Sequence, residues 1–137
     1  MNTEEKKELL EQAFHAMKHA YAPYSHYHVG ACVLCRNKAM YIGANIENAA
    51  YGVTSCAERN ALFAAYSNGM RKQDIKAIAI VSDGECIATP CGACRQVLSE
   101  LVQADTPIYL SNGKEEMETN IATLLPMSFS QEDLDHE

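Results

Sequence analysis

The apolar stretch IKAIAIVS, residues 75–82, decides the fold of this chain. Such a compact run suits a central strand that is buried on both faces, and Asp83-Gly84 ends it. A helix is predicted on each side of it along the sequence, from about residue 56 to 68 and from about residue 89 to 102. A strand between two helices is typical of an α/β domain.

The rest of the chain extends this pattern in both directions. Apolar residues spaced three and four apart predict an amphipathic helix over residues 4–20. Four further strands are predicted at residues 28–34, 40–45, 107–110 and about 115–119, with a helical turn at 121–125. The order α-β-β-α-β-α-β-β predicts a sheet with helices on its faces, which is an α/β layered domain.

Length and charge limit what the protein can be. Its 137 residues are enough for one hydrophobic core and too few for two ordinary domains, so residues 1–137 are expected to form one domain. Residues 130–137 are expected to be a solvated acidic tail. A net charge of −7, from 11 basic and 18 acidic residues, argues against nucleic acid as a partner. No apolar signal core and no apolar run of about 20 residues are present, so no membrane partner and a cytoplasmic location are expected.

The spacing of three cysteines is the strongest chemical signal. Cys56 lies at the start of the helix before the central strand, and Cys91 and Cys94 lie at the start of the helix after it. Residues three apart on a helix share a face, so Cys91 and Cys94 can hold one ion together. Three thiolates and one water complete a tetrahedral zinc site with an open catalytic position, whereas a structural site is closed by a fourth protein ligand.

The two helix starts also supply the electrostatics of such a site. Thr89 is predicted to be the N-cap of the second helix, with Pro90 at its first position. The partial positive charge of a helix N-terminus lowers the pKa of a thiol placed there. Three thiolates on Zn²⁺ leave a net charge of −1, and Arg59 is hypothesised to offset it by donating hydrogen bonds to ligand sulfurs.

Glu58 allows two interpretations. Ser55-Cys56-Ala57-Glu58 fits S-x-x-E, a capping box in which the Glu58 carboxylate accepts a hydrogen bond from the backbone N–H of Ser55. Beside a metal ligand, the same carboxylate can instead move protons in catalysis. The spacing alone gives the two roles equal weight.

Around these residues the sequence resembles the cytidine deaminase family. The resemblance rests on Cys56-Ala57-Glu58 and Pro90-Cys91-Gly92-Ala93-Cys94. It extends to Ala22–Ser25, Val29–Ala31, Asn45–Tyr51, Arg95–Val97 and Leu124–Pro126. It implies a three-layer α/β/α domain with a central mixed five-stranded sheet and one Zn²⁺ per subunit. It also implies hydrolytic deamination of free cytidine, and of deoxycytidine, to uridine or deoxyuridine and ammonia by zinc-activated water, a reaction of pyrimidine salvage.

The resemblance further implies a role for each matching residue. Glu58 matches the glutamate that takes the proton of water, protonates N3 of the base and passes a proton to the departing ammonia. Asn45 and Glu47 match the residues that bind the ribose, and the backbone N–H of Ala57 matches the group that holds the base carbonyl. Tyr27 stands where the family usually has a phenylalanine that packs against the pyrimidine.

Two aromatic residues concern the assembly. Tyr51 and Phe129 match aromatics that complete a neighbour's active site in the tetrameric members of the family. The short chain and the all-cysteine ligand set resemble that branch, so a homotetramer is implied.

Three other functions are weighed against this one. A deaminase of a modified nucleoside or of a blasticidin-type antibiotic shares the zinc motif. A deaminase of polynucleotides needs a basic channel, which this acidic chain lacks. A structural zinc module needs a fourth protein ligand, for which Cys86 is the candidate. The remaining Cys32 and Cys35 are expected to point to opposite faces of a strand and not to share a metal.

Overall fold

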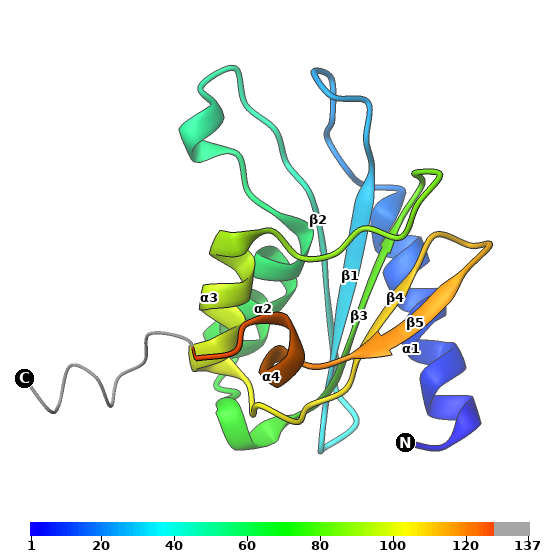
Figure 1. Ribbon diagram of the computed structural model, residues 1–137, viewed down its shortest axis with the longest axis vertical. Coiled ribbons are helices and arrows are strands. Elements are labelled where there is room, and N and C mark those ends of the chain that lie inside the picture. The colour runs from blue at the N-terminus through cyan, green and yellow to red at the C-terminus, as the bar shows by residue number, and fades with distance from the viewer. Residues whose placement is uncertain (128–137) are drawn as a thin grey trace, which may run out of the picture.

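The computed structural model in Figure 1 describes residues 1–127 of the chain. Phe129 and the predicted tail at residues 130–137 lie outside the described residues. The helices are α1 Thr3–Met17, α2 Ala57–Ser67, α3 Gly92–Leu101 and α4 Ile121–Leu124, with 3-10 turns at Tyr51–Val53 and Lys72–Asp74. The strands are β1 Val29–Cys35, β2 Met40–Ala44, β3 Ile75–Ser82, β4 Ile108–Ser111 and β5 Glu116–Thr119.

The five strands form one mixed sheet in the order β2-β1-β3-β4-β5. β3 runs parallel to β4, and the other neighbouring pairs are antiparallel. The predicted central strand at residues 75–82 is confirmed with both of its ends. Along β3 every side chain is buried except that of Lys76, whose ammonium bonds the Glu5 carboxylate of α1 at 2.9 Å.

Helices cover both faces of the sheet, so the three-layer arrangement is confirmed (Figure 1). Alternate residues of β3 enter different cores: Ala77 and Ala79 pack under α1, whereas Ile78 and Ile80 pack against α2 and α3. The same alternation separates Cys32 from Cys35, which are buried in different cores as expected. Since α2 and α3 share one face, their N-termini can meet.

Two glycines allow helices to lie directly on strands. A Cβ at Gly30 would stand 2.1 Å from the Ala13 carbonyl oxygen of α1. A Cβ at Gly43 would stand 2.4 Å from the backbone nitrogen of Ala61 in α2. Because both contacts are to backbone, a side chain at either position would force the helix away from the sheet.

α1 is shorter than the predicted helix at residues 4–20. It ends at Met17, and Lys18, His19 and Ala20 donate backbone hydrogen bonds to carbonyls three residues earlier. This tighter turn releases the chain, and Tyr21 then forms a bridge with Ile46. The apolar spacing continues past Met17, but the tertiary pairing of Tyr21 ends the helix.

Candidate active site

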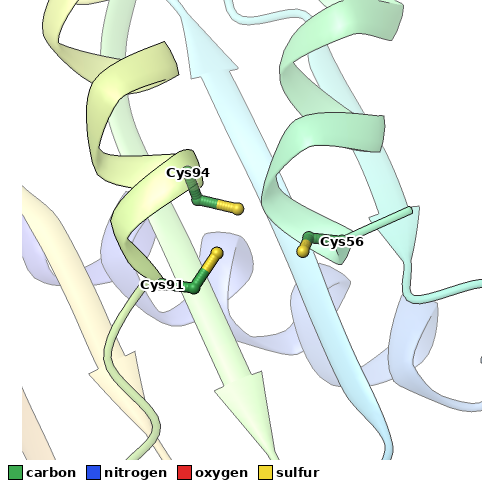
Figure 2. Close-up of side chains that lie close together, drawn as sticks. All are labelled: Cys56, Cys91 and Cys94. Atoms are coloured by element: carbon green, nitrogen blue, oxygen red, sulfur yellow. The ribbon is translucent and has the colours of Figure 1, made fainter. Parts of the chain in front are cut away.

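The three predicted ligand cysteines lie together between two helix N-termini. Their Sγ atoms are all within 4.8 Å of one another. Cys56 is the N-cap of α2, Cys91 is the N-cap of α3, and Cys94 lies in the first turn of α3. Figure 2 shows the sulfur atoms turned toward a common point from the two helices.

The start of α3 differs from the prediction that Thr89 is its N-cap and Pro90 its first residue. The helix begins at Gly92, and its first backbone hydrogen bond runs from Arg95 to the carbonyl of Cys91. Cys91 has the extended backbone of an N-cap, which carries its sulfur to the helix end. The Thr89 hydroxyl instead accepts a hydrogen bond from Arg95 at 3.2 Å.

Hydrogen bonds and burial shift the pKa values of Cys56 and Cys94 in opposite directions. The pKa of Cys56 is lowered to about 5, first by its side-chain interaction with Cys94 and then by the hydrogen bond that Arg59 donates. The Arg59 Nη2 donates to the Cys56 sulfur at 3.2 Å. The interaction with Cys56, burial and the nearby Glu58 carboxylate raise the pKa of Cys94. Thiols must lose their protons to bind a cation, so a lowered thiol pKa beside Arg59 favours metal binding at this cluster.

Glu58 lies beside this cluster with 7% of its surface exposed. Its Oε1 accepts a hydrogen bond from the Cys94 thiol at 3.1 Å. Burial is the main cause that raises the pKa of its carboxyl. The capping-box interpretation of Glu58 is wrong, because the Ser55 N–H donates to the Ile46 carbonyl at 2.9 Å.

A cavity of about 220 Å³ opens onto these groups. This volume is below the roughly 300–1,000 Å³ of sites for drug-sized ligands, so the cavity fits a small molecule or one end of it. Six of the predicted site residues line it: Tyr27, Asn45, Cys56, Ala57, Glu58 and Cys91. The remaining lining residues are Val29, Thr54, Ser55, Ile80, Ala88 and Thr89.

Asn45 and Tyr27 are fixed to each other at one wall of the cavity. The Asn45 amide donates to the Tyr27 carbonyl at 2.9 Å and accepts from the Val29 N–H at 2.9 Å. The Tyr27 ring lies over Gly84, where a Cβ would stand 2.8 Å from ring atom Cε1. Asn45 therefore helps to set where the ring lies.

Glu47 and Tyr51 line a neighbouring open cavity of about 410 Å³ with Tyr24, Ser25 and Thr54. The Glu47 carboxylate accepts hydrogen bonds from the Tyr24 and Ser25 N–H groups and from the Ser25 hydroxyl. These bonds, the hydroxyl's first, lower the pKa of Glu47. Thr54 lines both cavities, so the two sets of predicted residues lie on adjoining surfaces.

Thr54 and Arg95 were missed by the sequence analysis. Thr54 joins the two cavities, and Arg95 bonds the loop before Cys91. A signal was present for Arg95, which follows Cys91 by four residues and so shares its helix face. For Thr54 the only signal was its place just before Ser55-Cys56.

Comparison with known proteins agrees with this geometry. The sequence model of one protein family, the cytidine and deoxycytidylate deaminase zinc-binding region, matches residues 3–110. The chain belongs to this deaminase family. It is 50% identical to the cytidine deaminase of Halalkalibacterium halodurans over 127 residues, which covers 92% of this chain and 95% of the relative. It is 47% identical to the cytidine deaminase of Sporosarcina psychrophila, with 95% of each chain covered.

A solved structure of the same deaminase family has the same fold. The cytidine deaminase of Burkholderia pseudomallei superposes with a TM-score of 0.87 and 39% identity, covering 94% of this chain and all of that one. The predicted α/β fold with a mixed five-stranded sheet is confirmed.

The donor set fits the zinc of this deaminase family. Tetrahedral Zn–S bonds of about 2.3 Å place the sulfurs roughly 3.8 Å apart. The three Sγ atoms lie within 4.8 Å of one another, so small side-chain movements would bring them to that spacing. Cys56, Cys91 and Cys94 would hold the ion, and within residues 1–127 no further His, Cys, Asp or Glu joins this group. Cys86 is exposed and lies outside it, so the structural zinc module lacks its candidate fourth ligand.

Within the described part of the deaminase chain, no helix is long and apolar enough to cross a membrane.

Proposed function

We propose that this protein deaminates free cytidine, and deoxycytidine, to uridine or deoxyuridine and ammonia as a step of pyrimidine salvage. One observation carries the proposal: a buried carboxylate, Glu58, contacts the three-cysteine cluster inside a cavity for a small molecule. The homology to cytidine deaminases supports the same substrate.

The chemistry that the site must perform is the replacement of an amino group by oxygen at C4 of the base. Cys56, Cys91 and Cys94 would hold a zinc ion, which would supply a Lewis acid that lowers the pKa of water. Glu58 takes the proton that the water loses and delivers it to N3 while the water oxygen bonds to C4. It then moves the proton of the new C4 hydroxyl to the amino group, which leaves as ammonia when the C4–N bond breaks. The raised pKa of Glu58 suits this role, because a proton carrier works best when it is readily protonated and deprotonated near neutral pH.

The base is proposed to lie between Tyr27 and the start of α2. The first helical hydrogen bond of α2 runs from Asn60 to Cys56, so the Ala57 N–H has no acceptor within the helix. A backbone donor that its own helix does not use supports the role of Ala57 toward the base carbonyl. The Tyr27 ring supplies an apolar wall for the pyrimidine.

The sugar is proposed to lie toward Asn45 and Glu47. The two cavities that these residues line adjoin at Thr54, as a nucleoside with a base and a sugar requires. An amide and a carboxylate match the donors and acceptors of sugar hydroxyls. A polynucleotide is disfavoured because the net charge of −7 repels a phosphate backbone.

Arg59 is proposed to offset the charge of the zinc-thiolate centre. Its hydrogen bond to the Cys56 sulfur, with the negative charge there, raises the pKa of Arg59. A guanidinium that stays charged at this position compensates the net charge of −1 on three thiolates and Zn²⁺.

A homotetramer is proposed in which neighbours complete each site. The edge strand β2 and the segments near it expose large apolar side chains: Ile42 is 40%, Ile46 44% and Phe63 45% exposed. Tyr51, beside the Glu47 cavity, is 77% exposed. Such a surface supports burial against further copies of the chain. Light scattering should give four times the 15.1 kDa chain mass, and Ile42→Glu should lower it.

One assay tests the proposed reaction against its rivals. The purified zinc-loaded protein is incubated with cytidine, deoxycytidine, adenosine and blasticidin, and ammonia release is followed with and without a chelator. We expect chelator-sensitive release from the first two substrates. Release from blasticidin alone would make the protein an antibiotic deaminase, and no release from any cytosine compound would contradict the proposal.

A further inference from the structure

Each N-cap cysteine of the site is followed, four residues later, by a polar side chain that folds back over it. Asn60 follows Cys56 in α2, and Arg95 follows Cys91 in α3. Both are partly buried. Residues four apart share one helix face, so each of these side chains lies over the helix start that carries a ligand sulfur.

Neither helix has an ordinary cap. The N-cap of a helix normally turns a side-chain oxygen back to the free N–H groups of the first turn. Cys56 and Cys91 make no such hydrogen bond, and their sulfurs point into the cluster instead (Figure 2). With their sulfurs turned into the cluster, neither cysteine caps its own helix.

Arg95 makes three hydrogen bonds, two of them to the chain before Cys91. Its Nε donates to the Pro90 carbonyl at 2.7 Å, and its Nη2 donates to the Thr89 hydroxyl at 3.2 Å. Its Nη1 donates to the Leu124 carbonyl of α4 at 2.9 Å. The two residues that lead into Cys91 are thereby held to both α3 and α4.

Asn60 does the same before Cys56. Its Oδ1 accepts from the Ser55 hydroxyl at 2.5 Å, and its Nδ2 donates to the Ala44 carbonyl at the end of β2 at 2.7 Å. In both helices the side chain four residues after the cysteine bonds the residue before the cysteine and a carbonyl of another element. Two unrelated residue types thus perform one task.

We propose that Asn60 and Arg95 are positioning residues for the metal centre, replacing the caps that Cys56 and Cys91 give up as ligands. They act on the ligand sulfurs through the backbone on either side of them and touch neither the metal nor the substrate. The proposal rests on the proposed function only in requiring that the cluster binds zinc. Outer contacts that orient metal ligands typically change metal affinity or activity by about 10–100-fold when removed.

The test measures zinc release, without nucleoside, from Arg95→Met, Arg95→Lys, Asn60→Leu and Asn60→Asp. We expect Arg95→Met and Asn60→Leu to release zinc to a chromogenic chelator roughly tenfold faster than the wild type. Arg95→Lys keeps one donor for the Pro90 carbonyl, and Asn60→Asp keeps the acceptor for the Ser55 hydroxyl. Both should therefore recover part of the slow release.

Matched controls separate positioning from loss of stability. Arg36→Met removes two arginine hydrogen bonds, to Gln73 and Gln103, and Asn68→Leu removes an asparagine bond to the Ala64 carbonyl. Neither residue contacts the cysteine segments, so both variants should release zinc at the wild-type rate. Cobalt-loaded Arg95→Met and Asn60→Leu should show altered thiolate-to-cobalt absorption, and the controls should not.

Wild-type release rates and cobalt spectra in Arg95→Met and Asn60→Leu would overturn the proposal, even if these variants melt at lower temperature. If either variant fails to fold, Arg95→Lys or Asn60→Asp decides with the same two measurements. A wild-type protein that binds zinc but deaminates no cytidine would contradict the proposed function and leave this inference standing.

Discussion

The thiol of Cys94 donates a hydrogen bond to the carboxylate of Glu58 at 3.1 Å, so a residue of α3 directly contacts a residue of α2 across the site. This contact joins the metal-ligand cluster to the proposed proton carrier. The position of Glu58 thus depends on the cluster as well as on its own helix.

Replacing Glu58 by glutamine tests the proton carrier. Glutamine keeps the size of the side chain but cannot take up a proton, so kcat should fall by about 10²–10⁴-fold. Zinc content should stay at one per subunit, because Glu58 is not a ligand. Steady-state kinetics and metal analysis of the same sample check both values, and near-normal turnover with zinc present would remove Glu58 from the reaction.

Removing a ligand thiol tests the metal centre. Cys91→Ala should lose most of its zinc and its cytidine deamination together, since two sulfurs hold the ion far less tightly than three. Cys86→Ala is the matched control, because Cys86 is an exposed thiol outside the cluster. It should keep both zinc and activity, and loss of zinc in Cys86→Ala would revive the closed structural site.

These tests rest on residues that the sequence located to different degrees. The strand at residues 75–82 was predicted with both ends, because an apolar run with Lys76 as its one charged residue meets a turn at Asp83-Gly84. The start of α3 was misplaced, because Thr89-Pro90 is a typical helix start, whereas the Thr89 hydroxyl bonds Arg95 and Cys91 takes the N-cap. Local sequence patterns could not reveal the hydrogen bonds from Arg95 to Leu124 and from Tyr24 to Glu47, because each joins residues more than 20 apart.

Replacing Arg59 by methionine tests the compensation of charge. The Arg59 hydrogen bond helps to lower the pKa of Cys56, so its loss should raise that pKa. Zinc competes with protons for the thiolates, so a thiol with a higher pKa stays protonated, and resists zinc binding, up to a higher pH. The midpoint of zinc binding should therefore move to higher pH, with a smaller move in Arg59→Lys. Unchanged zinc binding and unchanged turnover in Arg59→Met would contradict the role.

Substitution of Gly43 by alanine tests the close contact between β2 and α2. The added Cβ would stand 2.4 Å from the Ala61 backbone nitrogen, which cannot move without α2. We expect a loss of about 1–3 kcal/mol in the free energy of unfolding, measured with urea. Gly52→Ala is the control, because a Cβ there meets nothing within 4 Å. An equal loss of stability in the two variants would show that the close contact with Ala61 does not cause the effect at Gly43.

Substitution of Gly84 by alanine tests whether the Tyr27 ring forms a wall of the substrate cavity. The new Cβ would stand 2.8 Å from ring atom Cε1, and a ring can move where a backbone cannot. The ring should shift, so KM for cytidine should rise several-fold, while the free energy of unfolding changes by less than about 1 kcal/mol. In a Tyr27→Ala background the ring is gone, so Gly84→Ala should have no further effect on KM. Full additivity of the two substitutions would mean that Gly84 acts on the cavity by a route other than Tyr27.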